Sequence, residues 1–151
     1  MTQMPGPAFD GLYGQMIMDH YRTPRNRDPL LAPALKAYEL NPFCGDLIDL
    51  QLCLNNNGAV AGVYANSEGC SIIQASASMM SEAVKGKTPS EMLDLSTRFR
   101  AFLRDRAGDA SSEPPPELGD LGALGVVRQY PVRIKCALLP WTALEEAIRD
   151  V

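Results

Sequence analysis

An alternation of apolar and polar side chains in the middle of the chain constrains the fold most strongly. Apolar residues occupy every second position from Ile48 to Leu54, and a period of two is the signature of a half-buried strand. Asn55-Asn56-Asn57-Gly58 follows and is typical of a hairpin turn. Val60 to Asn66 has the pattern of a returning strand. The sequence therefore predicts an antiparallel hairpin over residues 46–66.

Helical patterns flank this hairpin on both sides. Apolar residues recur at helical spacing, and Asp10 and Gly86 are suited to begin and to end helices. The predicted helices span residues 10–21, 71 to about 86, 90–104 and 121–127, and a last helix follows Cys136. The stretch Tyr130–Lys135 is predicted to be extended, which would leave Pro140 in the first turn of that last helix.

The chain has 151 residues, which suits one domain with a hydrophobic core. Residues 1–9 are predicted to be a loose tail, and residues 10–151 a single domain. An inserted loop is predicted at about 105–119, because Gly108, Ser111-Ser112 and Pro114-Pro115-Pro116 interrupt the helical pattern. A hairpin among helices predicts an α+β fold, with a small antiparallel β-sheet packed against several helices.

Charge and composition exclude several classes of partner. The chain carries 14 basic and 18 acidic residues, for a net charge of −4, and has no basic stripe, so no nucleic acid is expected. No apolar run approaches membrane-spanning length, so no membrane partner is expected. The N-terminus lacks the basic and apolar regions of a secretory signal, which makes a cytoplasmic location the expectation. Thiols stay reduced there.

Three cysteines stand in distinctive settings, and none belongs to a CxxC pair. Cys44 precedes Gly45 and Asp46, Cys70 follows Gly69, and Cys136 lies before the last predicted helix. The hairpin brings its two ends together, so Cys44 and Asp46 are expected near Cys70. Pairing of the four cysteines as two disulfides stays an alternative, but it needs an oxidising compartment.

Three thiolates and one carboxylate form a plausible four-ligand site. Thiolates suit zinc, copper(I) and iron–sulfur clusters, and carboxylate is an accepted zinc ligand. Oxygen matches a soft site less well than sulfur, so such a site should exchange its contents more readily than one of four thiolates. Cys53 lies inside the alternating run and is expected to be structural. His20, the one histidine, lies on an apolar helix face and is expected to be a packing residue.

The local context of these residues resembles the U-type iron–sulfur assembly family, which includes IscU, the N-terminal domain of NifU, and SufU. Four motifs carry the resemblance, in order, over about residues 12–148. They are Tyr13 with Ile17–Tyr21 and Pro24–Asn26, then Asn41–Asp46, then Glu68–Ile72 with Ala75–Met80, and finally Pro131–Leu138. Two features favour the SufU branch: Lys135 stands where IscU-like proteins have histidine, and SufU-like proteins carry an extra segment where 105–119 lies.

The resemblance implies a fold, a site and partners. Cys44, Asp46, Cys70 and Cys136 would bind Zn²⁺, and Cys44 would accept persulfide sulfur from a SufS-type, pyridoxal-phosphate-dependent cysteine desulfurase whose docking displaces it from zinc. Sulfur would then pass to downstream iron–sulfur assembly proteins. Arg133 and Lys135 are weaker candidates for contact with the persulfide or the partner. Two alternatives stay open: an IscU-like scaffold that carries a transient [2Fe–2S] cluster, and a structural zinc protein that acts as an interaction module.

Overall fold

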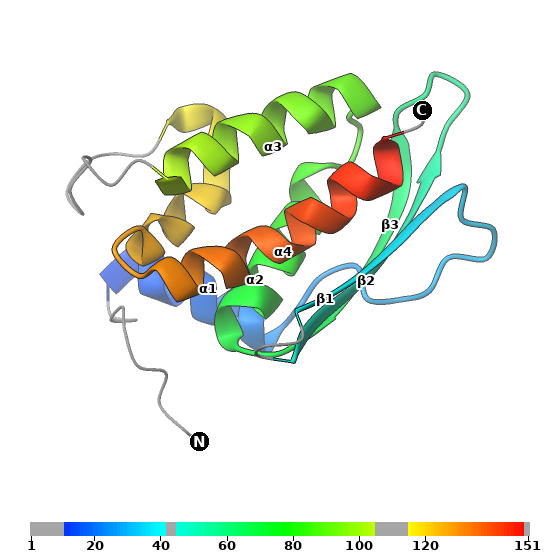
Figure 1. The fold of residues 1–151 in the computed structure, drawn as a ribbon. Coiled ribbons are helices and arrows are strands. Elements are labelled where there is room, and N and C mark those ends of the chain that lie inside the picture. Colours follow the sequence, from blue (N-terminus) through cyan, green and yellow to red (C-terminus); the bar gives the residue numbers. More distant parts are fainter. Residues whose placement is uncertain (1–10, 42–44, 105–114, 150–151) are drawn as a thin grey trace.

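The computed structural model describes residues 11–41, 45–104 and 115–149. The protein is built on a three-stranded antiparallel sheet that carries helices on one face (Figure 1). The predicted α+β class is confirmed. In chain order the elements are α1 (Gly11–Arg22), β1 (Leu35–Asn41), β2 (Asp46–Leu54), β3 (Val60–Glu68), α2 (Ser71–Ala83), α3 (Pro89–Arg104), the 3-10 helix η1 (Pro116–Val127) and α4 (Pro131–Ile148).

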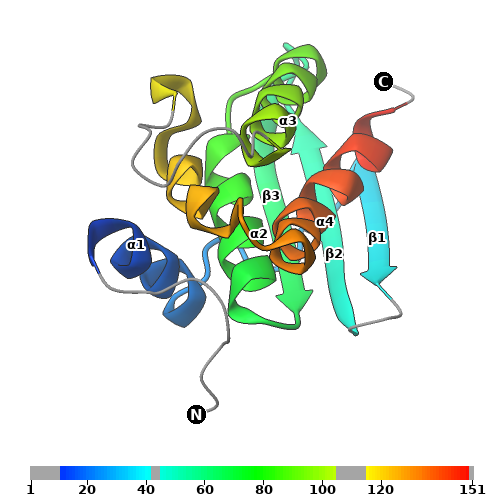
Figure 2. The ribbon, with the colours of Figure 1, turned by 60° about the vertical axis from the view of Figure 1, so that its left-hand side comes forward.

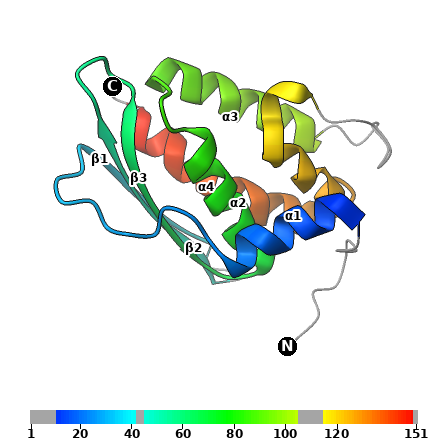
Figure 3. The ribbon, with the colours of Figure 1, turned by 180° about the vertical axis from the view of Figure 1, so that it is seen from behind.

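The helices lie in two layers over the sheet. The inner layer is α2, which contacts β3, and α4, which contacts β1 and β2, and both cross the same sheet face in Figure 2. The outer layer is α1, η1 and α3, which pack on the inner helices. Figure 3 shows the same arrangement from behind. Among the described residues, no helix is both long enough and apolar enough to cross a bilayer.

The predicted hairpin is confirmed as β2 and β3. Ile48, Leu50 and Leu52 are fully buried on one face of β2, and Gly58 has a positive φ of 80° in the connecting turn. The register pairs Leu47 with Glu68, so β3 runs two residues further than predicted. As a result, the start of β2 and the residues that follow β3 lie at the same end of the sheet.

The sequence pattern assigned no structure to Leu35–Leu40, which the structure shows to be most of β1. This strand pairs with β2 at the edge of the sheet. Its side chains alternate between half-buried and exposed positions, and none is fully buried. An edge strand of this kind carries too weak a hydrophobic alternation to stand out in the sequence.

The expectation for residues 130–140 was wrong. Pro131 begins α4, so Tyr130–Lys135 is not an extended stretch, and Cys136 and Pro140 both lie inside the helix. Proline favours the first helical position because its φ is preset and its missing N–H would be unpaired there. Ile134, Ala137 and Trp141 are buried at helical spacing, and packing of that face overrides the cost of Pro140.

Part of the predicted inserted loop is helical. The predicted tail over residues 1–9, and residues 105–114 of the loop, lie outside the described residues. Residues 116–119 do not: they begin η1, where Leu118 is buried with 3% of its surface exposed. η1 is interrupted by a kink at Gly119, whose φ of 55° and ψ of −130° are not helical, and the helix predicted at 121–127 lies after this kink.

Candidate metal centre

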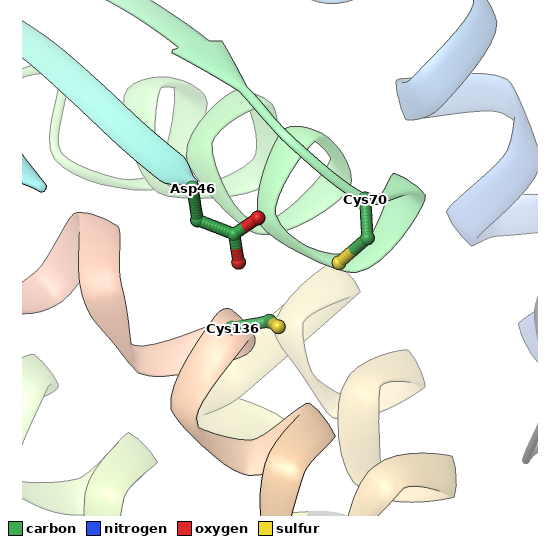
Figure 4. A group of neighbouring side chains, drawn as sticks. All are labelled: Asp46, Cys70 and Cys136. Atoms are coloured by element: carbon green, nitrogen blue, oxygen red, sulfur yellow. The ribbon is translucent and has the colours of Figure 1, made fainter. Parts of the chain in front are cut away.

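Three residues that the sequence singled out converge at one end of the molecule. Asp46 is the first residue of β2, Cys70 is the N-cap of α2, and Cys136 lies on α4. Their potential ligand atoms all lie within 4.8 Å of one another. Figure 4 shows the carboxylate and the two sulfur atoms turned toward a common point between the three elements. Such a convergence of one oxygen and two sulfurs is able to hold a metal ion.

Glycine makes this approach possible. Gly69 has a φ of +137°, and a Cβ added to it would lie 2.1 Å from Oδ1 of Asp46. No other residue type leaves room for the carboxylate at that place. Gly45 also has a positive φ, of 74°, directly before Asp46. The chain therefore turns tightly on both sides of the hairpin to bring Asp46 and Cys70 together.

The Asp46 carboxylate is buried without full hydrogen bonding. The residue is 3% exposed, and its Oδ2 atom has no hydrogen-bond partner among the described residues. A buried carboxylate oxygen without a partner is costly, and native proteins rarely tolerate one. A bound cation would supply the missing partner, so the residues present fit a metal ion.

The pKa values of the Cys70 and Cys136 thiols depend on each other. A hydrogen bond from Cys136 lowers the pKa of the Cys70 thiol to about 6, and the backbone N–H groups of Ile73 and Ile72 act in the same direction against burial. The same hydrogen bond, burial and the Asp46 carboxylate raise the pKa of Cys136. Of the two thiols, Cys70 at the N-terminus of α2 is therefore the one whose thiolate form is favoured.

The other cysteines are placed differently. Cys44 lies outside the described residues. Cys53 is half-buried near the far end of β2, where its sulfur would be 2.9 Å from a Cβ added to Gly62. Seven residues separate it from Asp46, which is roughly 23 Å along a strand. Among the described residues, Asp46, Cys70 and Cys136 are the one such group of potential ligands, and Cys53 is not part of it.

The two basic candidates lie on the first turns of α4. Lys135 is exposed and directly precedes Cys136, while Arg133 is half-buried two residues earlier. Val132 beside them is 67% exposed. Val132, Arg133 and Lys135 thus lie within four residues of Cys136 along the chain. Their contact with a partner stays a prediction.

His20 is a packing residue, as predicted. It is 4% exposed, and its two ring nitrogens lie 2.7 Å from Oγ of Ser78 and 3.4 Å from Oδ2 of Asp120. Sequence reasoning did not single out Gly69 by its contact with Asp46, although the glycine directly before Cys70 was a visible signal.

Comparison with known proteins agrees with the geometry. The family model for the NifU-like N-terminal domain matches residues 12–112. The chain is 42% identical to the zinc-dependent sulfurtransferase SufU of Bacillus subtilis (strain 168), over 93% of this chain and 91% of that protein. It is 36% identical to the iron–sulfur cluster assembly scaffold protein IscU of Streptococcus pyogenes serotype M1, over 91% and 83%.

The fold has a solved counterpart as well. A crystal structure from Fervidobacterium islandicum AW-1, described as a scaffold protein for iron–sulfur cluster assembly in the SUF system, matches with a TM-score of 0.77 and 29% identity. The match covers 89% of this chain and 94% of the other. Family model, relatives and fold point the same way: the chain belongs to the NifU-like N-terminal domain family, which the resemblance in its sequence had predicted.

Proposed function

We propose that this protein is a zinc-dependent sulfur acceptor in iron–sulfur cluster biogenesis. In this proposal Cys44, Asp46, Cys70 and Cys136 hold Zn²⁺, and Cys44 receives the sulfur. The donor is a persulfide on a SufS-type cysteine desulfurase, and downstream assembly proteins take the sulfur onward. The similarity to the SufU of B. subtilis supports this assignment.

The observation that carries the proposal is the buried Asp46 carboxylate beside two thiols. Its Oδ2 has no hydrogen-bond partner among the described residues, while Cys70 and Cys136 lie within ligand distance of it. Cys44 precedes Asp46 by two residues, and two residues of chain span at most about 7 Å. A fourth ligand from Cys44 is therefore compatible with the chain.

The ligand set explains why the site would give up one thiol. Zinc bound here would keep its cysteine ligands deprotonated and therefore nucleophilic. Cys70 is the N-cap of α2 and Cys136 lies inside α4, whereas Cys44 belongs to the segment between β1 and β2. We infer that Cys70, Cys136 and Asp46 form the fixed part of the site, and that Cys44 is the ligand that leaves.

The transfer itself is a thiolate–persulfide exchange. The Cys44 thiolate attacks the outer sulfur of the donor persulfide and forms a new S–S bond. The S–S bond of the donor breaks, and the cysteine of the desulfurase leaves as a thiolate. The transferred sulfur carries the negative charge of the donor persulfide and becomes the outer sulfur of a persulfide on Cys44. One S–S bond replaces another, so no external oxidant, reductant or proton is needed.

A scaffold function is the second candidate. The S. pyogenes relative and the F. islandicum structure are both described as assembly scaffolds. Three cysteines with one aspartate would also suit a [2Fe–2S] cluster. Lys135 weighs against this candidate, since IscU-like proteins have histidine at that position. A structural zinc module is the third candidate, and it differs from the proposal in that its site would not release a ligand.

The test is the metal content of the purified protein, followed by the turnover of a cysteine desulfurase with and without it. We expect one zinc per chain and a large stimulation of turnover. Cys44→Ser should abolish the stimulation, because a serine hydroxyl is not ionised at neutral pH and does not accept sulfane sulfur. Cys53→Ser is the matched control and should keep near-normal activity, since Cys53 lies far from the site.

The alternatives give distinct results. Iron with acid-labile sulfide in the purified protein would favour the scaffold. Zinc without any stimulation of the desulfurase would favour the structural module. Loss of stimulation in Cys53→Ser, with Cys44→Ser unaffected, would overturn the ligand assignment.

A further inference from the structure

A buried hydroxyl joins the two helices that carry Cys70 and Cys136. Ser76 lies on α2 with no exposed surface, and its Oγ donates a hydrogen bond of 2.6 Å to the carbonyl oxygen of Ala137 on α4. Ala137 directly follows Cys136, and Ser76 lies six residues after Cys70. One hydrogen bond therefore ties the backbone beside one thiol to the helix that begins at the other.

Pro140 weakens α4 at the place where this bond acts. In a regular helix, the carbonyl of residue 136 accepts a hydrogen bond from the N–H of residue 140. Proline has no N–H, and its ring crowds the carbonyl four residues earlier. Pro140 lies inside α4, so the backbone at Cys136 lacks one of its helical hydrogen bonds. A bond from another helix then has more influence on the position of the thiol than it would in an unbroken helix.

We propose that Ser76 is a positioning residue of the metal centre. Its bond to Ala137 sets the position of Cys136 Sγ relative to Cys70 Sγ, and so keeps a bound metal ion from escaping. The inference rests on the metal site of the proposed function, but not on sulfur transfer. Ser76 acts through the backbone of its neighbour on α4 rather than through a bond to the metal.

A second buried serine provides a matched comparison. Ser96 on α3 also has no exposed surface, and it also donates to α4, through the carboxylate of Glu145. Glu145 lies nine residues after Cys136, or roughly 13 Å along the helix. Removal of either hydroxyl takes a hydrogen bond from α4, a buried one at Ser76 and a partly buried one at Ser96. Only the loss of Ser76 takes that bond from beside the thiol.

The experiment compares the zinc-loaded wild-type protein with Ser76→Ala and Ser96→Ala. The rate of zinc loss to a chromogenic chelator is measured for each, and urea unfolding of the metal-free proteins reports their stability. We expect both variants to lose stability, and only Ser76→Ala to release zinc faster, by about tenfold, the lower end of the range for residues that orient metal ligands. Cobalt(II) loaded in place of zinc should show shifted absorption bands in Ser76→Ala alone, because its geometry has changed.

Equal rates of zinc loss in the two alanine variants, or a wild-type cobalt spectrum in Ser76→Ala, would overturn the proposal. If Ser76→Ala does not fold, Ser76→Thr decides the question, since it keeps the hydroxyl. A folded Ser76→Thr that holds zinc like the wild type supports the proposal, and one that loses zinc tenfold faster contradicts it. A wild type that holds zinc but does not stimulate a desulfurase would refute the sulfur-transfer function and leave the role of Ser76 standing.

Discussion

Two polar clusters lie against helix α2, and they differ in how the hydrogen-bonding groups of their buried members are satisfied. The thiol cluster consists of Asp46, Cys70 and Cys136 at the N-terminal end of the helix. The histidine cluster consists of His20, Ser78 and Asp120, and Ser78 lies in the second half of the same helix. Both contain groups that are able to bind a metal or to transfer a proton, so their residue types alone do not separate them.

The histidine cluster is closed by its own hydrogen bonds. Ser78 Oγ accepts the backbone N–H of Arg25 at 3.0 Å, which leaves its hydroxyl free to donate to Nδ1 of His20. That assigns the ring proton to Nε2, which faces Asp120. Burial lowers the pKa of His20, although the hydrogen bond to Asp120 opposes it. The neutral ring is thus fully used in joining α1, α2 and η1.

The thiol cluster contains a buried polar atom that its own residues leave without a hydrogen-bond partner. Asp46 Oδ2 is buried without a partner among the described residues, and the hydrogen bond between the two thiols lowers the pKa of Cys70 and raises the pKa of Cys136. A protein optimised only for stability would not keep such a group. Unmet hydrogen bonding alone does not mark a site, because Trp141 Nε1 and Arg25 Nη1 are also buried without a partner among the described residues. The contrast teaches that an unpartnered carboxylate beside two thiols, rather than the presence of reactive residue types, distinguishes the candidate metal centre from the histidine cluster.

Substitution of Gly69 should damage the thiol cluster most. In Gly69→Ala the new methyl group would collide with the Asp46 carboxylate, which lies 2.1 Å away, in a backbone with a φ of +137°. We expect a loss of about 3 kcal/mol in the free energy of unfolding together with loss of bound zinc. Urea unfolding and the zinc content measure the two effects separately.

Gly58→Ala is the control for backbone strain. Gly58 also has a positive φ, of 80°, but nothing lies within 4 Å of a Cβ added there. This variant should lose about 1 kcal/mol and keep its zinc. If both variants kept their zinc, contact with Gly69 would have no part in holding Asp46 at the site.

Removal of the charge from Asp46 should separate metal binding from stability. Asp46→Asn keeps the size of the side chain but loses the anionic ligand, so we expect zinc affinity to fall by roughly tenfold or more. The metal-free variant should be as stable as the metal-free wild type, or more so, because an unpaired buried charge has been removed. Chelator competition and urea unfolding test this. Unchanged affinity and lower stability would make Asp46 a turn residue.

Changes in the histidine cluster should have the opposite effect to that of Asp46→Asn. They should lower the stability of the protein and leave zinc affinity unchanged. His20→Gln should lower the free energy of unfolding by about 1 kcal/mol, since one buried hydrogen bond, to Ser78, and one partly exposed one, to Asp120, are lost. The difference between the wild type and this variant should also depend on pH. Below the ordinary histidine pKa of 6.5, the unfolded chain takes up a proton that the folded protein resists, so the wild type loses stability relative to the variant.

Urea unfolding of both metal-free proteins between pH 5 and 7.5 measures this difference. Thiols and carboxylates titrate in both proteins, so their contribution to the pH dependence cancels when His20→Gln is compared with the wild type. A wild-type advantage that grows on acidification would mean that His20 is protonated in the folded state and that the histidine cluster is not closed.

The strongest elements of the fold were predictable because their signals are local. The β2–β3 hairpin follows from alternation and its turn, and α3 from helical spacing. The beginning of α4 was not predictable in the same way. The charged residues Arg133 and Lys135 obscured the apolar pattern of its first turns. Pro140, which is favoured in a first turn, suggested that the helix begins later. Burial of Trp141, whose ring centroid lies 5.1 Å from that of Phe99, comes from tertiary packing that no local pattern reveals.

The candidate site divides in the same manner. The hairpin alone predicted that Asp46 lies near Cys70, because antiparallel strands bring their outer ends together. Cys136 is distant in the chain; its setting made it a candidate ligand, and only the resemblance placed it at the same zinc site. The contact of Gly69 with Asp46 and the bond from Ser76 to Ala137 depend on distances between elements, which the sequence does not contain.

X-ray absorption at the zinc edge of the zinc-loaded protein tests the central claim most directly. A zinc ion held by three cysteines and Asp46 would give a shell of three sulfurs at about 2.3 Å and one oxygen at about 2.0–2.2 Å. The scattering signature of an imidazole ligand would place the metal at the histidine cluster. That result, or a shell of four sulfurs without oxygen, would contradict the proposed zinc site.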